Sequence, residues 1–451
     1  MSKRLFGTDG IRGVAGEAPL DNRTVQAVGI ALGIDLSHRF PGQPVLIGMD
    51  TRESGPAIAS HLAHGLKQQG VRSEFAGVIT TPGVAYLART ADFAAGIMIS
   101  ASHNPYRDNG IKVFAHNGYK LPDSEELEIE TEIFRVLDSG ALSTQPDSTP
   151  PLAVSWSGQP YLDFLLSTVP SRLEGQTVVV DCGNGAASAL AIQLFEKAGA
   201  KVVPVSCQPD GRNINLDCGA LHVEKLRGRV IEMKHGAGLA GVAFDGDADR
   251  AMMVAPGGRI IDGDAILLIA ARRMQADGHL PGNIVVSTVM ANLGLEKALG
   301  RLGIDMVRTP VGDKYVLEEM IRRDAALGGE QSGHIIFREF ATTGDGMLSA
   351  LQILATCVRE HATLDELAAD LTVFPQILVN VRVKERRPLE VIPRIAQEIL
   401  DCEREMDGSG RILVRYSGTE PLARVMVEGP DRSAVERWAG RIAAAIRSEL
   451  A

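Results

Sequence analysis

One arrangement of apolar and polar positions occurs three times along the chain. Each copy has a short apolar run, a polar turn, an amphipathic stretch of helical period, a glycine and a second extended run. This order predicts a βαβ unit, whose two strands pair in parallel. The predicted strand, helix and strand span 44–50, 54–69 and 71–76 in the first copy, 177–181, 186–198 and 201–205 in the second, and 283–288, 293–302 and 304–309 in the third.

The repetition predicts three related α/β domains with mostly parallel sheets. Beyond residue 372 the pattern changes to strands at 376–383, 410–416 and 424–428 and helices at 389–401 and 432–450. These elements predict a C-terminal α+β domain with a mostly antiparallel sheet. We therefore expect a four-domain α/β protein around a central cleft. The expected domains are 1–153, 154–256, 257–371 and 372–451.

Composition and charge narrow the class of protein. The chain has 451 residues, 45% of them hydrophobic, and a formal net charge of −10, which argues against a nucleic acid or an anionic membrane as the main partner. Its five cysteines form no Cys-x-x-Cys pair, which is typical of a reducing compartment without a zinc site or disulfide framework. No apolar run approaches membrane-spanning length, so we expect a soluble cytoplasmic protein.

A serine-rich loop follows the predicted strand at 96–99. Ser100, Ser102 and His103 precede an Asn-Pro pair, and Asp-Asn-Gly follows at 108–110. Both are turn signals, so the serines and the histidine are expected in a tight loop at a strand end, where reactive groups are often displayed. The alternative is a Ser/Asn-rich turn without chemistry.

A second loop carries three carboxylates after the predicted strand at 240–244. Asp245, Asp247 and Asp249 alternate with small residues, and in an extended loop this spacing points them toward one locus. Three converging carboxylates are costly unless a cation neutralises them, and oxygen ligands favour a hard ion such as Mg²⁺. The loop is not an EF-hand, because Arg250 stands where that motif needs glycine. The alternative is a solvated acidic turn.

Three further segments are candidate substrate-binding loops. Glu330 and Ser332 lie in a Gly-Gly-Glu-Gln-Ser-Gly-His segment, which suits recognition of sugar hydroxyls, although a hairpin turn is an equal alternative. A cradle for phosphate is predicted near the C-terminus, where the alternative is a β-turn with an exposed arginine. Its members are Arg415, Ser417, Gly418, Thr419 and Arg424. Thr8 and Arg12 lie on a glycine-rich N-terminal segment that either joins a site or forms a plain turn.

A displayed serine, a hard-metal site, a hydroxyl-binding loop and a phosphate cradle together favour phosphoryl transfer on a sugar phosphate. The sequence resembles the α-D-phosphohexomutase family through five ordered motifs at 7–13, 100–105, 245–250, 329–334 and 415–421. The resemblance implies that Ser102 carries the phosphoryl group and joins the three aspartates around one Mg²⁺ per subunit. It also implies that His103 and Lys112 handle protons or steady the phosphoryl group, that Arg250 follows the metal loop, and that Glu330 and Ser332 bind the sugar.

Within the family, the overall pattern is most similar to members that act on glucosamine phosphates. The resemblance then implies interconversion of glucosamine 6-phosphate and glucosamine 1-phosphate through phosphoserine and a 1,6-bisphosphate, which also serves as activator. The product would enter UDP-N-acetylglucosamine and cell-wall precursor synthesis. Members preferring glucose or mannose share all five motifs and are the nearest alternative. Pro310 departs from the lysine expected in its loop.

Two alternative functions from other protein classes are a non-catalytic sugar-phosphate sensor and a metal-dependent phosphatase acting through phosphoserine. The retained serine, aspartates, lysine and cradle disfavour the sensor, and a phosphatase has no need of a second phosphate site. The resemblance also suggests a homodimer. It further implies a hinge at 373–376 that lets the fourth domain open and close.

Overall fold

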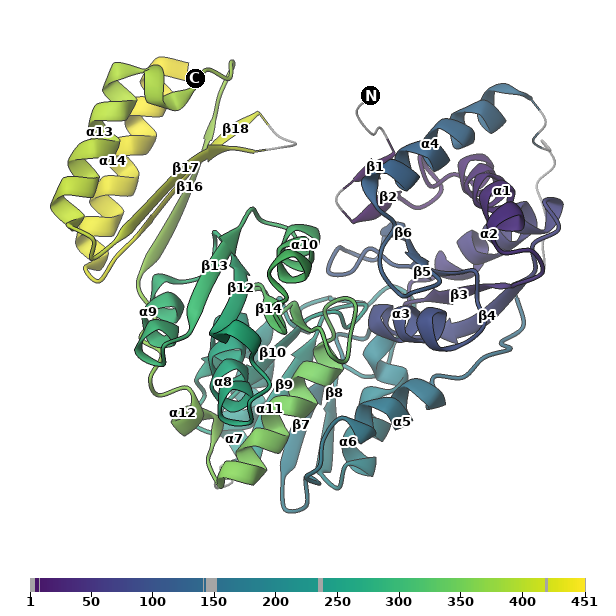
Figure 1. Cartoon of the computed structure of the whole chain (residues 1–451), viewed down its shortest axis with the longest axis horizontal. Helices are drawn as coiled ribbons and strands as arrows, with labels where there is room; N and C mark the ends of the chain where they lie inside the picture. The colour runs from purple at the N-terminus through teal and green to yellow at the C-terminus, as the bar shows by residue number, and fades with distance from the viewer. Residues whose placement is uncertain are drawn as a thin grey trace. The chain divides into compact units, whose positions relative to one another are not determined.

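The computed structural model describes residues 5–7, 9–140, 142, 152–233, 238–417 and 421–450 (Figure 1). The chain forms two compact units. Unit 1 comprises residues 1–289 and 307–368, and unit 2 comprises residues 290–306 and 369–451. Helix α9 (Leu293–Arg301) therefore belongs to the same unit as the C-terminal sheet, although it follows a strand of the third sheet in the chain.

The first sheet of unit 1 has six strands. Strand β3 pairs in parallel with β4 and β5, and β5, β6, β2 and β1 continue the sheet in antiparallel pairs. The strands in spatial order are β1 (Phe6–Gly7), β2 (Gly10–Val14), β6 (Asp108–Ala115), β5 (Ala95–Ile99), β3 (Val45–Met49) and β4 (Ser73–Val78). The accompanying helices are α1 (Asn22–Arg39), α2 (Gly55–Gln68), α3 (Thr81–Thr90) and α4 (Asp123–Asp138).

The second sheet has the same plan. Strand β7 pairs in parallel with β8 and β9, and β9, β10 and β11 are antiparallel. Its strands in spatial order are β11 (Ile260–Ile261), β10 (Ala251–Val254), β9 (Leu239–Phe244), β7 (Thr177–Asp181) and β8 (Lys201–Val205). Its helices are α5 (Gln159–Ser167), α6 (Ala191–Lys197) and α7 (Val223–Met233), with the 3₁₀ turn η1 (Ala186–Ala189).

The third sheet pairs β12 in parallel with β14, and β14 antiparallel with β15. Its spatial order is β13 (Asp305–Thr309), β12 (Ile284–Thr288), β14 (Leu327–Gly329) and β15 (Ile335–Phe337). The neighbouring helices are α8 (Gly263–Ala276), α10 (Asp313–Arg323), α11 (Gly346–Glu360) and α12 (Leu364–Leu367), with the 3₁₀ turn η2 (Pro281–Asn283).

The three predicted strand–helix–strand units are present as β3–α2–β4, β7–α6–β8 and β12–α9–β13. The pairs β3–β4 and β7–β8 are parallel as expected. Each sheet nevertheless also carries antiparallel strands, because short loops such as the one between β9 and β10 can join only antiparallel neighbours. The helix predicted from residue 186 begins later, at Ala191, after the 3₁₀ turn.

Helices α1 and α2, which accompany the first sheet, pack closely against each other. Helices α1 and α2 approach so closely that a Cβ on Gly29 would lie 2.3 Å from the Leu62 carbonyl oxygen, and one on Gly65 would lie 2.4 Å from that of Gln26. Only glycine permits such an approach of two backbones. The two helices enclose a continuous apolar cluster with β3 and β5, and burial of this kind is the dominant stabilising contribution to folding.

Unit 2 contains an antiparallel sheet against which α13 (Pro393–Met406) and α14 (Arg432–Leu450) pack around a separate apolar core. The strand order is β16 (Gln376–Arg382), β18 (Leu422–Glu428) and β17 (Arg411–Tyr416), and the 3₁₀ turn η3 (Leu389–Val391) precedes α13. This confirms the predicted C-terminal α+β fold. The segment predicted as a hinge is bound within unit 2, where Phe374 and Asn292 exchange two hydrogen bonds of 3.0 Å.

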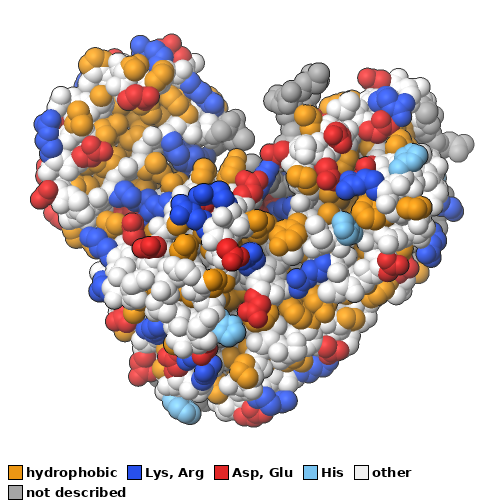
Figure 2. All heavy atoms as spheres, in the orientation of Figure 1, with side chains coloured by type: hydrophobic (Ala, Val, Ile, Leu, Met, Phe, Trp, Pro, Cys, Tyr) orange, Lys and Arg blue, Asp and Glu red, His pale blue; other side chains and the backbone are white. Residues whose placement is uncertain are grey.

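Among the described residues, no helix combines the length and apolar character that a membrane span requires. On the face drawn in Figure 2, acidic and basic side chains are interspersed, and apolar side chains lie between them.

Candidate active site

The serine loop joins β5 to β6 and holds Ser102 in an unusual conformation. Ser102 has φ of +52°, in the left-handed region, and is 1% exposed. Its Oγ donates a 2.6 Å hydrogen bond to Asp245 Oδ2 and lies 3.2 Å from His103 Nδ1. The predicted loop therefore brings its second serine, rather than Ser100, to the aspartate loop. Ser100 Oγ is committed elsewhere, donating to Asp50 at 2.6 Å.

The aspartate loop is the connection of the β9–β10 hairpin. Asp245, Asp247 and Asp249 are buried, and one oxygen of each lies within 4.8 Å of the others. Ala248 at φ of +57° bends the backbone between the second and third aspartate. A Cβ on Gly246 would lie 2.4 Å from the Ser102 carbonyl oxygen, so glycine is needed where the two loops touch.

The electrostatics of the three aspartates fit a divalent cation. Burial, then Asp249 and Asp247, raise the pKa of Asp245 well above its usual value. The Oδ1 atoms of Asp247 and Asp249 are buried and have no hydrogen-bond partner among the described residues. Unsatisfied buried carboxylate oxygens are costly, and an all-oxygen donor set suits a hard ion such as Mg²⁺. The residues present therefore fit the expected metal.

Lys112 supplies positive charge to the same cluster. It lies on β6, is 1% exposed, and its Nζ is 2.9 Å from Asp247, 3.0 Å from Asp9 and 3.6 Å from Asp249. Burial alone would lower its pKa, but these carboxylates outweigh burial and raise the pKa well above the ordinary value. A lysine held protonated in this way can stabilise a phosphoryl group but is a poor proton acceptor.

The pKa of His103 is shifted in the opposite direction to that of Lys112. Burial, reinforced by the nearby Arg250 and Arg12 cations, lowers its pKa to about 4. A neutral imidazole at physiological pH can accept a proton, so of the two residues considered for proton handling His103 suits that role better. Arg250 follows the metal loop, and its Nε lies 3.9 Å from Asp249 Oδ1. Burial would lower the pKa of Arg250, but the aspartates nearby raise it instead.

The predicted sugar-binding loop is the turn between β14 and β15. Ser332 Oγ donates to Glu330 Oε2 at 3.3 Å, and the Gly312 amide donates to Glu330 Oε1 at 3.1 Å. The turn is attached to the β9–β10 hairpin, because the Ala251 amide donates a 3.1 Å hydrogen bond to the Gly333 carbonyl. The Glu330 carboxylate is thus fixed beside the start of α10.

The N-terminal segment and a charged network complete this part of unit 1. Arg12, on β2, pairs with Asp9, whose pKa is lowered because Lys112, Lys120 and Arg12 outweigh its burial. Lys120 also pairs with Asp313 at 2.5 Å. Thr8 lies outside the described residues.

Several residues of this network were not singled out from the sequence. His334 lies 3.5 Å from Asp249 through Nδ1, and its Nε2 accepts a 3.0 Å hydrogen bond from the Gly344 amide. Thr81 Oγ1 donates to Asp247 at 2.6 Å from the start of α3. His334 ends the sugar-loop motif and Asp9 lies in the motif at 7–13, so both had a sequence signal, whereas Thr81 is identified only by spatial proximity.

In unit 2, the predicted phosphate cradle has two arginines on facing strands. Arg415 on β17 is directly opposite Arg424 on β18 in an antiparallel pair. Burial, followed by the charge of Arg424, lowers the pKa of Arg415. Like charges placed opposite one another are unfavourable unless an anion binds between them, which is what a phosphate site requires. Ser417 is buried at the end of β17, and Gly418 and Thr419 lie outside the described residues.

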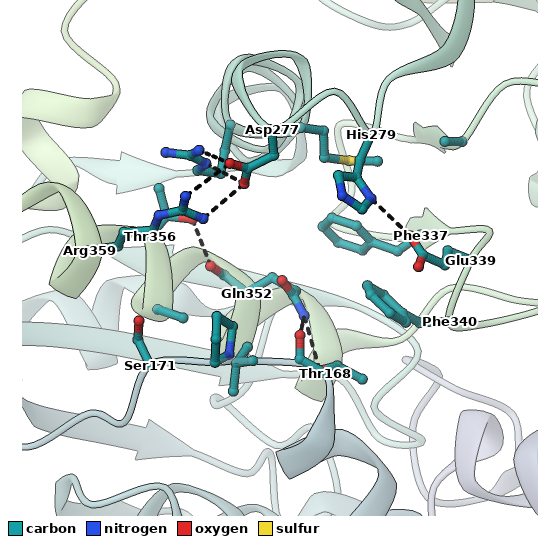
Figure 3. Close-up of a pocket in the computed structure, with 16 residues that line it drawn as sticks. Thr168, Ser171, Asp277, His279, Phe337, Glu339, Phe340, Gln352, Thr356 and Arg359 are labelled. Carbon is teal, nitrogen blue, oxygen red and sulfur yellow. Dashed lines mark hydrogen bonds and ion pairs between the residues drawn. The ribbon is translucent and has the colours of Figure 1, made fainter.

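Unit 1 also contains a pocket of about 450 Å³ (Figure 3). Phe337 and Phe340 line it, together with Asp277, which pairs with both Arg273 and Arg359. None of the predicted site residues that the structure describes lines it. Because its arginines are already neutralised by acidic partners, its charge does not indicate a phosphate ligand.

Comparison with known families covers nearly the whole chain. Four phosphoglucomutase/phosphomannomutase domain families match it in succession. These are alpha/beta/alpha domain I at residues 3–139, domain II at 159–258, domain III at 262–374 and the C-terminal domain at 378–445.

Individual relatives agree with the family match. The chain is 56% identical to a phosphoglucosamine mutase of Solibacter usitatus, over all of both chains. It is 49% identical to that of Koribacter versatilis, covering 99% of this chain and 97% of the relative. Among solved structures, a phosphoglucomutase/phosphomannomutase family protein of Burkholderia thailandensis has a TM-score of 0.79 at 24% identity, covering 98% and 97% of the two chains.

The fold is also shared with Aspergillus fumigatus N-acetylphosphoglucosamine mutase, solved with GlcNAc-6P and magnesium, at a TM-score of 0.67 and 21% identity over 99% of this chain and 96% of that one. The four domain matches and the full-length relatives place the chain in one family. It belongs to the phosphoglucosamine mutase group of the phosphoglucomutase/phosphomannomutase family.

Proposed function

We propose that the protein interconverts glucosamine 6-phosphate and glucosamine 1-phosphate through a phosphorylated Ser102. The observation that carries this proposal is the 2.6 Å contact between Ser102 Oγ and Asp245, within a buried cluster of three carboxylates and one lysine. A serine in this position is activated and electrostatically supported as a phosphoryl carrier.

The proposed cycle has two phosphoryl transfers. In the first, the free sugar hydroxyl forms a bond to phosphorus, the bond from phosphorus to Ser102 Oγ breaks, and neutral His103 accepts the hydroxyl proton. The product is the sugar 1,6-bisphosphate. In the second, the Ser102 oxyanion left by the first transfer forms a bond to the other phosphorus, the bond from that phosphorus to the sugar oxygen breaks, and protonated His103 returns its proton to the sugar oxygen that leaves. Lys112 stays charged throughout and balances negative charge on the phosphoryl oxygens.

Mg²⁺ is the metal that we propose for the site, with ligands from Ser102, Asp245, Asp247 and Asp249. When bound, it would withdraw charge from the phosphoryl group. Sugar hydroxyls would be bound by Glu330 and Ser332, and the second phosphate by Arg415, Ser417, Gly418, Thr419 and Arg424. Thr8 and Arg12 would complete the substrate contacts, and Arg250, beside Asp249, would be a further catalytic residue. A hexosamine 1,6-bisphosphate is the proposed activator, because it would phosphorylate a Ser102 that carries no phosphoryl group.

Turnover of glucosamine 6-phosphate with Mg²⁺ and a trace of hexose 1,6-bisphosphate tests the proposal. Ser102→Ala should abolish turnover and leave the fold intact, whereas Ser433→Ala, at an exposed site in unit 2, should retain it. Near-normal activity in a folded Ser102→Ala protein would refute the assignment. Glucose and mannose phosphates, assayed in parallel, test the second candidate substrates, and release of inorganic phosphate would indicate a phosphatase instead.

A cytoplasmic location, expected from the cysteine pattern and hydropathy, and a homodimer, suggested by the family resemblance, remain predictions. Cell fractionation and light scattering of the purified chain would test them. Neither affects the chemistry proposed for Ser102.

A further inference from the structure

The backbone that follows the Ser102 side chain is held by two residues from outside the loop. The Ser102 carbonyl oxygen accepts hydrogen bonds from Arg52 at 3.1 Å and from Asn215 Nδ2 at 2.9 Å. The carbonyl oxygen of Asn104 accepts from the same two side chains, at 2.7 and 3.2 Å. Two loop carbonyls, two residues apart, are therefore each bound twice.

Arg52 is unusually well placed for this role. It is 1% exposed, and its Nε also donates to the Asp108 carbonyl at 2.7 Å, where the loop enters β6. Its charge is balanced by Asp50 at 3.1 Å. Asp50 in turn accepts from Ser100 Oγ, which accepts the Ser102 amide at 2.9 Å. Both the N–H and the carbonyl of Ser102 are thus fixed by one connected network.

Asn215 approaches the loop from a different domain of unit 1. It follows β8 in the chain and is anchored by its own amide, which donates to the Gly183 carbonyl at 2.8 Å. Asn215 itself has φ of +56°, a conformation that asparagine tolerates better than most residues. The loop is therefore held from two directions, by a clamp of two side chains. Arg52 follows β3 of the first sheet, and Asn215 follows β8 of the second.

The clamp has a physical reason. A non-glycine residue in the left-handed conformation costs about 1–2 kcal/mol, so Ser102 would relax if nothing held it. Relaxation would turn Oγ away from Asp245. In the proposed cycle Ser102 must act once as leaving group and once as nucleophile, and each transfer needs its oxygen in line with phosphorus.

We propose that Arg52 and Asn215 are positioning residues that hold Ser102 in its reactive conformation for both phosphoryl transfers. This inference rests on the proposed function only in taking Ser102 as the phosphoryl carrier; it is independent of which sugar is the substrate. Neither residue touches the reacting atoms, so their loss should lower kcat and leave the KM for sugar phosphate nearly unchanged.

The test uses three variants of the full chain. Arg52→Lys keeps the charge beside Asp50 but cannot bind three carbonyls at once, because an ammonium lacks the fork geometry of a guanidinium. Asn215→Gly removes the amide and accepts the left-handed backbone without strain. Arg107→Lys is the matched control, since Arg107 lies in the same loop but is exposed, and its side chain interacts with the neighbouring Tyr106.

The measurements are kcat, KM, the thermal midpoint, and the rate at which hexose 1,6-bisphosphate phosphorylates Ser102, followed by intact-mass spectrometry. We expect kcat and the phosphorylation rate to fall about 100-fold in Arg52→Lys and about tenfold in Asn215→Gly, with KM within about twofold of the unsubstituted protein. Arg107→Lys should match the unsubstituted protein in every measurement.

Three results would overturn the inference. The first is kcat within about twofold of the original in both folded variants, and the second is a rise in KM at constant kcat, which indicates substrate binding. The third is full recovery of kcat at a temperature well below the variant's thermal midpoint, which indicates a role in stability alone. If the unsubstituted protein accepts phosphate on Ser102 but does not isomerise glucosamine phosphate, the proposed substrate fails while the clamp is still tested.

Discussion

Asp345, a buried carboxyl close to the aspartate loop, should make the stability of the protein depend on pH. It caps α11, accepting from the Leu348 amide at 2.9 Å, and its other oxygen accepts from the Tyr161 hydroxyl of α5 at 2.7 Å. Burial raises its pKa from 3.8 to about 6. The neighbouring Gly346 amide donates to the Ala248 carbonyl within the aspartate loop, so the Asp345 carboxyl lies one residue from a direct contact with that loop.

The sign and size of the effect follow from the raised pKa. Between 3.8 and about 6 the folded protein keeps a proton on Asp345 that the unfolded chain has lost, so the free energy of unfolding decreases as the pH rises through this window. A shift of about two pKa units at about 1.4 kcal/mol each makes the full effect about 3 kcal/mol. About 2 kcal/mol of it falls between about pH 4 and about pH 7.

Asp345→Asn removes the titration and keeps an acceptor for the cap. The difference in unfolding free energy between Asp345→Asn and the parent protein should therefore move in favour of the variant by about 2 kcal/mol from about pH 4 to about pH 7. The chain has two tryptophans, Trp156 in unit 1 and Trp438 in unit 2. Urea unfolding in a Trp438→Phe background, followed by tryptophan fluorescence, then reports unit 1 alone.

A second variant sharpens the test. The Tyr161 hydroxyl lowers the pKa of Asp345 against the effect of burial, so Tyr161→Phe should raise that pKa further and steepen the loss of stability with rising pH. Parallel stability curves for Asp345→Asn and its parent across the whole range would refute the reasoning, because they would mean that Asp345 titrates alike in the folded and unfolded chains.

Three further outcomes are expected. Lys112→Met removes the cation from among three carboxylates and should cost about 3–5 kcal/mol in unfolding free energy, measured by urea unfolding without added metal; an unchanged midpoint would contradict the burial argument. Gly246→Ala should strongly reduce turnover, because its Cβ would lie 2.4 Å from the Ser102 carbonyl, whereas Gly228→Ala has no atom within 4 Å and should be fully active. Mg²⁺ at 100 times its Kd should stabilise the protein by about 2.7 kcal/mol, and Asp247→Asn should lose most of this gain in a thermal-shift titration.

Local patterns were sufficient to predict most elements of this fold. The strand at 177–181, the helix at 432–450 and the antiparallel C-terminal sheet were predictable because apolar periodicity and glycine stops act over a few residues. The mixed character of the sheets was not, because the direction of pairing at β6 and β10 depends on which distant strand lies beside them.

The candidate site divides in the same way. From the sequence came the candidate chemistry-bearing groups: the three aspartates through their spacing after a strand, and Ser102 and Lys112 through the family resemblance. Only the tertiary structure decided how they meet: that Lys112 lies among carboxylates from two loops, that His334 and Thr81 adjoin the aspartates, and that Arg52 and Asn215 hold the Ser102 backbone. These contacts join residues far apart in the chain, and their energies depend on burial and distance, which exist only once the domains have packed.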